Sequence, residues 1–171
     1  MIMRFIGGLL VCASCALLGL YMGERGVRRA DLLLEFKHTL LLLKSEIIYA
    51  IQPLPQAFES IANKTHGPFA EFYADIAGML TKKQTPLEEA WKIAADKLCQ
   101  TSLAKTDIGL MGGLGRSLGK IDADIQLAAI DMLVIELDSI VSRLNADNAK
   151  NVKMYRSLGI LGGLLITVVL L

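Results

Sequence analysis

The sequence has 171 residues, 53% of them hydrophobic, and a formal net charge of +1. The length suits one domain of ordinary size, and the mean hydropathy of +0.47 is high for a soluble domain. Residues 30–149 hold 11 basic and 16 acidic side chains, and this net charge of about −5 argues against nucleic-acid binding. Of three cysteines only Cys99 lies in this middle part, which excludes a disulfide framework.

The first predicted element is an apolar run without a charged side chain, residues 5–22. It just reaches the length of about 20 residues that a membrane-spanning helix needs. A cleaved signal peptide is the alternative, but only one basic residue precedes the run and no good cleavage site follows it. We therefore predict a retained transmembrane helix over residues 1–24. Its small residues Gly8 and Gly19 would let another helix approach closely.

Basic side chains flank both terminal apolar runs on their inner sides. They are Arg25, Arg28 and Arg29 after the first run, and Lys150, Lys153 and Arg156 before the last. Because Lys and Arg beside a span stay in the cytoplasm, we expect a cytoplasmic middle domain and both termini outside. The C-terminal membrane segment, residues 157–171, is short, so a complete span and a partly inserted tail both stay open. Its Gly159 and Gly163 have the spacing of a close helix contact.

The middle domain, residues 25–156, is predicted to hold six helices and no strand. The expected ranges are a first helix to about residue 51, then 57–63, 68–81, 85–99, 103–118 and 122–171. Apolar side chains at 3-4 spacing line the first and last of these helices, which predicts that the two pair antiparallel. The apolar positions are Leu33, Phe36, Leu40, Leu43 and Ile47 on the first, and Ile130, Leu133, Leu137, Ile140 and Leu144 on the last. The predicted fold class is all-α: a six-helix cytoplasmic bundle whose long end helices continue into the membrane segments.

Local signals predict where some helices begin and how one of them packs. Thr85 is expected to cap a helix together with Glu88, and Asp122 to cap the last one. Gly112, Gly113 and Gly115 weaken a helix by about 1 kcal/mol each relative to alanine. We therefore expect another backbone to press against these glycines.

The residues show no catalytic, cofactor-binding or metal-binding constellation, so we predict a protein that is not an enzyme. His38 and His66 have no second His or Cys at ligand spacing. The glycine-rich stretch 109–117 matches neither phosphate-binding pattern, and no strand precedes it.

Four segments resemble one family, stage III sporulation protein AB of endospore-forming bacteria. They are Leu43-x-Ser45-Glu46-Ile47-x-Tyr49, Thr85 with Glu89-Ala90-Trp91, Leu114-Gly115-x-x-Leu118-Gly119-x-x-Asp122-x-x-x-Gln126, and Tyr155-Arg156-Ser157-Leu158-Gly159 with Gly162-Gly163. The resemblance spans the whole chain. It implies a platform component of the channel between mother cell and forespore, similar to inner-membrane platform proteins of type II secretion and type IV pilus systems.

The resemblance further implies partners: a secretion-type AA ATPase, other channel membrane proteins and the bilayer of the mother-cell membrane around the forespore. Glu46, Arg116, Asp122 and Gln126 become candidates for the shared surface, or else for fixing the turn before the last helix. A homo-oligomer stays open. The alternative function is a small holin-like or regulatory membrane protein that acts by oligomerisation of its spans.

Overall fold

The structure is a computed structural model that describes residues 26–50, 52–82, 84–120 and 122–170, with the side chains left out at residue 50 and from 151 onwards. The chain divides into two compact units. The terminal unit comprises Met1–Ala30 and Ser142–Leu171, and the bundle unit comprises Asp31–Val141. The domain boundaries expected from the sequence, 1–24, 25–156 and 157–171, stay a prediction.

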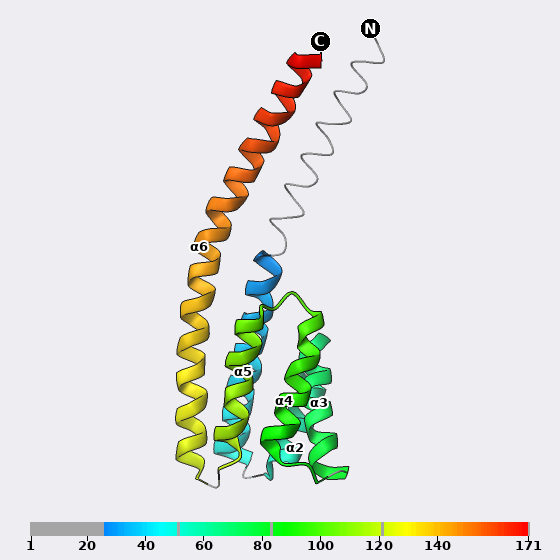
Figure 1. Ribbon diagram of the computed structural model, residues 1–171. Helices are drawn as coiled ribbons and strands as arrows, with labels where there is room; N and C mark the ends of the chain where they lie inside the picture. Colours follow the sequence, from blue (N-terminus) through cyan, green and yellow to red (C-terminus); the bar gives the residue numbers. More distant parts are fainter. Residues whose placement is uncertain (1–25, 51, 83, 121, 171) are drawn as a thin grey trace. The chain divides into compact units, whose positions relative to one another are not determined.

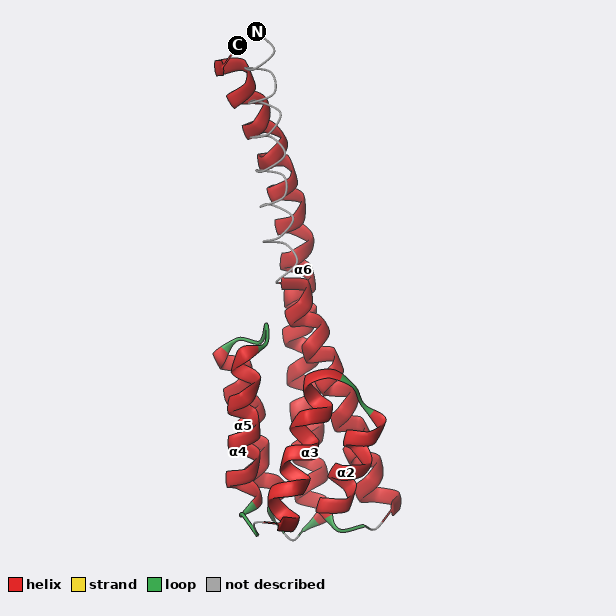
Figure 2. Cartoon of the chain, turned by 90° about the vertical axis from the view of Figure 1, so that its right-hand side faces the viewer, coloured by secondary structure: helices red, strands yellow, loops and turns green. Residues whose placement is uncertain are grey.

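Six long helices make up the described chain, and it contains no strand, which confirms the all-α six-helix prediction (Figures 1 and 2). The first helix covers residues 26–45 and continues as a π-helical turn, η1, over Glu46–Ala50. The others are α2 (Leu54–Lys64), α3 (Gly67–Lys82), α4 (Leu87–Lys97) with the 3-10 turn η2 (Leu98–Gln100), α5 (Lys105–Leu118) and α6 (Ala123–Leu170).

Most of the apolar positions predicted to pair the first helix with α6 are buried in the structure. The first helix buries Leu33, Phe36, Leu40 and Leu43, and α6 buries Ile130, Leu133, Leu137 and Val141. The prediction was wrong at Ile47 on the first helix and at Ile140 and Leu144 on α6, which are only half-buried. A strict heptad pattern drifts around a straight helix of 3.6 residues per turn, so the buried stripe moves to Val141.

An aromatic cluster fills the centre of the bundle unit. Phe36 contacts Phe69 and Phe72 with ring centroids 5.4 and 6.4 Å apart. Trp91 meets Phe72 edge-on at 5.0 Å. All these rings are buried, and each such pair adds about 0.5–1.5 kcal/mol beyond its burial. The cluster therefore ties the first helix, α3 and α4 together.

Buried polar groups in this core find partners. The Tyr73 hydroxyl lies 2.9 Å from Thr39 Oγ1, which donates to the Phe36 carbonyl at 2.7 Å. Both side chains are fully buried. Tyr73 therefore donates to Thr39, since that is the arrangement in which every proton has an acceptor.

Two ion pairs fix the register between the first helix and α6. Lys37 Nζ lies 2.6 Å from Asp138 Oδ1, and Lys44 Nζ lies 2.5 and 2.7 Å from the two Asp131 oxygens. The lysines are seven residues apart along one helix, and the aspartates are seven apart in the opposite direction along the other. This pattern confirms the antiparallel pairing within the bundle unit. The chain accordingly enters the unit at Asp31 and leaves it at Val141 on the same end (Figure 1).

Two local predictions were wrong. The helix α4 begins after Pro86 without a side-chain cap, and Glu88 binds Arg116 instead of closing a capping box with Thr85. Pro86 rather than Thr85 occupies the N-cap position, so the Thr85 hydroxyl lies one residue too early to accept from the free N–H groups of α4. The glycines of α5 do not receive another backbone either: Gly115 faces a side chain, and Gly112 and Gly113 face open space.

Within the described part of the chain, no helix combines the length and apolarity that crossing a membrane requires. The predicted N-terminal span lies outside the described residues, as do its packing residues Gly8 and Gly19. The helix α6 continues to Leu170. The surroundings of Gly159 and Gly163 in it are not described.

Candidate functional site

Asp122 and Gln126 meet at the turn between α5 and α6. The Asp122 carboxylate accepts the Asp124 backbone N–H at 2.9 Å. The buried Gln126 side chain donates to the carbonyls of Leu118 at 3.0 Å and Lys120 at 2.5 Å. These contacts cap α6 and satisfy carbonyls that the end of α5 leaves unpaired. The two residues hold the turn in place.

Glu46 lies where the first helix ends and contacts α2. Its Oε1 accepts hydrogen bonds from Lys64 Nζ at 2.7 Å and Ser60 Oγ at 2.8 Å, and the side chain is only 12% exposed. The bonds from Lys64 and then Ser60 lower the pKa of Glu46. Its carboxylate is thus engaged within the fold.

Arg116 on α5 pairs with Glu88 on α4, with Nε and Nη2 each 3.0 Å from Oε1. Both side chains are largely exposed, at 78% and 55%. Of the four residues singled out in the sequence, the structure brings only Asp122 and Gln126 together. Arg116 and Asp122 are exposed, whereas Gln126 is buried and Glu46 is half-buried.

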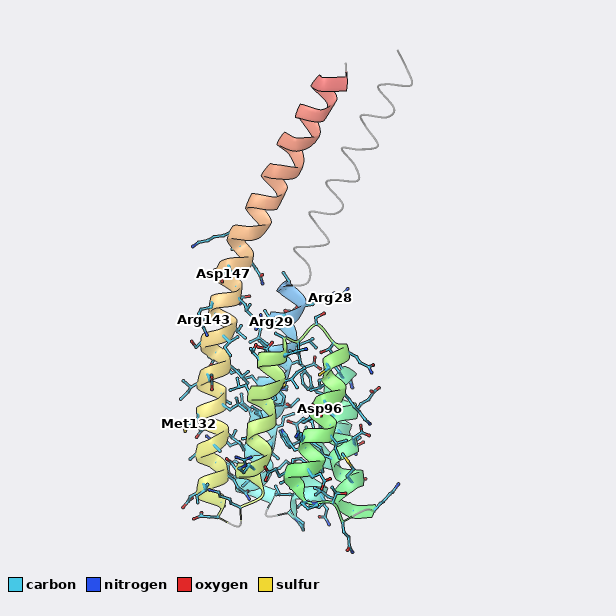
Figure 3. The ribbon with its side chains drawn as sticks, in the orientation of Figure 1. Arg28, Arg29, Asp96, Met132, Arg143 and Asp147 are labelled. Atoms are coloured by element: carbon cyan, nitrogen blue, oxygen red, sulfur yellow. The ribbon has the colours of Figure 1, made fainter. Side chains whose placement is uncertain are left out.

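The six basic residues that flank the predicted membrane segments all belong to the terminal unit. Arg28 is exposed, Arg29 is half-buried and Lys150 is exposed (Figure 3 marks Arg28 and Arg29). Arg25 lies outside the described residues, and the side chains of Lys153 and Arg156 are not described. His38 and His66 are exposed, and His66 Nδ1 lies 2.7 Å from the Thr65 carbonyl oxygen. Among the described residues no cluster of side chains suited to a metal occurs.

A cavity of about 520 Å³ lies along the surface between α4 and α5, and we call it the α4–α5 groove. The residues of its α4 wall follow one another at intervals of four, three, one and three positions, so they lie on one face of the helix. Those residues are Glu88, Lys92, Ala95 and Asp96 of α4, with Cys99 of the following turn η2 at the end of the wall. Its α5 wall consists of Lys105, Ile108, Gly109, Gly112, Gly113 and Arg116. Figure 1 shows the two helices next to each other, in Figure 2 they overlap in the view, and Figure 3 marks Asp96 on the α4 wall.

The glycines of α5 fall into two kinds. A Cβ on Gly115 would lie 2.6 Å from Trp91 Cβ, so only glycine lets this buried ring dock and donate its Nε1–H to the Met111 carbonyl at 2.8 Å. A Cβ on Gly109, Gly112 or Gly113 would meet no described atom within 4 Å. Each of these three glycines costs the helix about 1 kcal/mol relative to alanine. The packing of the described chain does not account for that cost.

The charges along the groove differ from those of the domain around it. Its walls carry three basic and two acidic side chains, although residues 30–149 have a net charge of about −5. Glu88 and Arg116 neutralise each other. Over the described residues, neither Lys92 nor Lys105 forms an ion pair. The groove therefore offers two free ammonium groups beside a glycine floor.

This groove was not predicted from the sequence. A signal was present, because Lys105, Gly109, Gly112, Gly113 and Arg116 fall at the four- and three-residue spacing of one helix face. The glycines were instead assigned to packing within the chain. Only the distances around them separate Gly115 from the other three.

Comparison with known proteins places the chain in a family. A family model described as stage III sporulation protein AB matches residues 4–171. The chain belongs to the stage III sporulation protein AB family. A stage III sporulation protein AB of Bacillus subtilis (strain 168) is 26% identical over 170 residues, which covers 99% of each chain. This confirms the resemblance noted in the sequence.

A solved structure of a stage III sporulation protein AB shares the fold. It superimposes with a TM-score of 0.65 at 23% identity, and the match covers 71% of this chain and 97% of that chain. The helical architecture is thus common to members of the stage III sporulation protein AB family that differ at most positions.

Proposed function

We propose that this member of the stage III sporulation protein AB family is a non-enzymatic membrane platform of the channel between mother cell and forespore. Its helical bundle lies in the cytoplasm and docks a secretion-type ATPase, and its two ends anchor it in the mother-cell membrane around the forespore. Family membership supports the sporulation setting. The observation that carries the platform role is the antiparallel pairing of the first helix with α6.

This pairing matters because it brings entry and exit of the chain to one end of the bundle unit. Two apolar runs that follow from the same end can enter one bilayer together, whereas runs at opposite ends could not. The ion pairs Lys37–Asp138 and Lys44–Asp131 hold that arrangement in register. Arg28, Arg29 and Lys150 would then face anionic headgroups, each adding about 1 kcal/mol of attraction.

The remaining partners follow from the same arrangement. Small residues in the two membrane segments, Gly8 and Gly19 in one and Gly159 and Gly163 in the other, would let spans of other channel proteins pack closely. The opposite end of the bundle unit and its sides stay free for the ATPase. The net charge of about −5 on residues 30–149 keeps that domain off the anionic membrane surface.

A binding measurement tests this function. The purified full-length chain is reconstituted in lipid nanodiscs, and the AA ATPase of the sporulation channel is passed over them and over empty nanodiscs in biolayer interferometry. The proposal expects saturable binding to the loaded discs only. Equal signals from loaded and empty discs would show that the chain docks no such ATPase.

A further inference from the structure

The three unexplained glycines of the α4–α5 groove suggest what the groove holds. A glycine at a helix surface lets another backbone approach more closely than any side chain would allow. Gly109, Gly112 and Gly113 lie along one side of α5, and open space lies above each of them. A second helix resting there would account for glycine at all three positions.

The dimensions of the groove agree with a helix. Its α4 wall extends from Glu88 to Cys99, which is roughly 16 Å at 1.5 Å per residue. This length accommodates about three helical turns of a partner. Many helix-in-groove complexes use an amphipathic helix whose anchors recur every three or four residues.

The charged side chains of the groove indicate which side chains a bound helix would carry. Lys92 stands on one wall and Lys105 on the other, and both ammonium groups lack a carboxylate partner in the described chain. A helix with carboxylates on its two sides would pair with both. Asp96 follows Lys92 by one helical turn on α4 and would accept one basic residue of the same partner helix. Such alternation of basic and acidic groups along the groove would fix the register and orientation of the partner helix as well as add affinity.

We propose that the α4–α5 groove is the docking site for a helix of the partner ATPase, which sets small side chains on Gly109, Gly112 and Gly113 and carboxylates against Lys92 and Lys105. The identity of the partner rests on the proposed function. The groove itself is defined by distances and charges within this chain. Arg116, an exposed residue among those singled out in the sequence, borders the same groove.

Matched substitutions test the floor and the walls of the groove. Gly113→Leu fills the floor, and Gly78→Leu on α3 is its control, since a Cβ at Gly78 also meets no described atom within 4 Å. Lys92→Glu reverses a wall charge, and Lys82→Glu reverses an exposed charge at the end of α3. The full-length variants in nanodiscs are titrated with the ATPase. Gly113→Leu and Lys92→Glu are expected to weaken binding about tenfold or more, and both controls to stay within about twofold.

A gentler substitution separates binding from folding. Gly113→Ala removes a helix-weakening glycine without a clash, so it is expected to raise the melting temperature by about 4 °C. The same methyl group would hold the partner helix away and weaken ATPase binding about fivefold. A variant that is more stable and yet binds less well cannot be explained by misfolding.

The native thiol of Cys99 reports occupancy of the groove directly, because it is exposed and lines the α4 wall. Its alkylation by a charged maleimide is followed by peptide mass spectrometry in the presence and absence of the ATPase. Protection of Cys99 together with weakened binding of the two groove variants supports the proposal. ATPase binding with an unchanged alkylation rate and unaffected groove variants overturns it and leaves the proposed function standing. Absence of binding by the wild-type chain overturns both.

Discussion

Two glycines of α5, only two residues apart, should respond in opposite ways to the same substitution. Alanine in place of glycine strengthens a helix by about 1 kcal/mol. At Gly113 nothing described lies within 4 Å of the new methyl group, so this gain should be realised in full. At Gly115 the methyl group would lie 2.6 Å from Trp91 Cβ and 2.7 Å from its Cγ.

The expected magnitude at Gly115 follows from these contacts. Relief of the clash requires Trp91 or the whole of α4 to move, and overpacking of this kind costs about 1–3 kcal/mol. Movement of the ring would also weaken its hydrogen bond to the Met111 carbonyl, worth about 1 kcal/mol. After the helix gain of about 1 kcal/mol is subtracted, Gly115→Ala should destabilise the domain by about 1–3 kcal/mol. That corresponds to a fall in melting temperature of about 4–12 °C.

Trp91 is the only tryptophan in the chain, so its fluorescence reports on this contact during thermal unfolding. The full-length chain and both variants are unfolded in the same detergent, with far-UV circular dichroism as the second probe. Gly113→Ala should melt higher than wild type, and Gly115→Ala lower. The reasoning is refuted if Gly115→Ala melts at or above the wild-type temperature, or if Gly113→Ala melts well below it.

Three further predictions concern buried and paired polar groups. Burial raises the pKa of the Tyr73 hydroxyl well above the usual value for tyrosine, so above about pH 10 the unfolded chain loses a proton that the folded chain keeps. The unfolding free energy should therefore fall by about 1.4 kcal/mol per pH unit more steeply than in Tyr73→Phe. Equal slopes in the two proteins would contradict this. Gln126→Ala should lower the free energy of unfolding in denaturant by about 1–3 kcal/mol, since the carbonyls of Leu118 and Lys120 lose their donor. Amide hydrogen exchange at the α5–α6 turn should become faster. Unchanged protection of these amides would count against the prediction. A double-mutant cycle on Lys44 and Asp131 should give a coupling free energy of about 0.5–1 kcal/mol that becomes smaller in about 1 M salt. A coupling that does not depend on salt would show that charge does not set the register of the two helices.

The sequence was sufficient for the helices and for the pairing of the two longest ones, because apolar side chains at 3-4 spacing have few structural alternatives. Leu33 and Leu137, assigned by spacing alone to the facing apolar sides of the two helices, are buried in the structure. Spacing could not provide the register. That depends on which lysine reaches which aspartate across 101 and 87 residues of sequence, as in Lys37–Asp138 and Lys44–Asp131.

The site was harder to predict than the fold. Glu46 and Gln126 are polar residues that a sequence pattern makes conspicuous, yet their contacts lie within the chain. The sequence does not distinguish Gly113 from Gly115, since a glycine that receives a ring and one that faces open space are the same letter. The difference depends on the three-dimensional surroundings of each Cβ position.

The account depends most on a cytoplasmic bundle held by two membrane-anchored ends, and the exposed thiol of Cys99 allows a direct test. Non-sporulating cells that express the full-length chain in their plasma membrane are treated with a membrane-impermeant maleimide before or after permeabilisation, and the modification of Cys99 is quantified by mass spectrometry. We expect Cys99 to be modified only after permeabilisation, while a cysteine added before Met1 is modified in both samples. Modification of Cys99 in intact cells would place the bundle outside the cytoplasm and contradict the platform role.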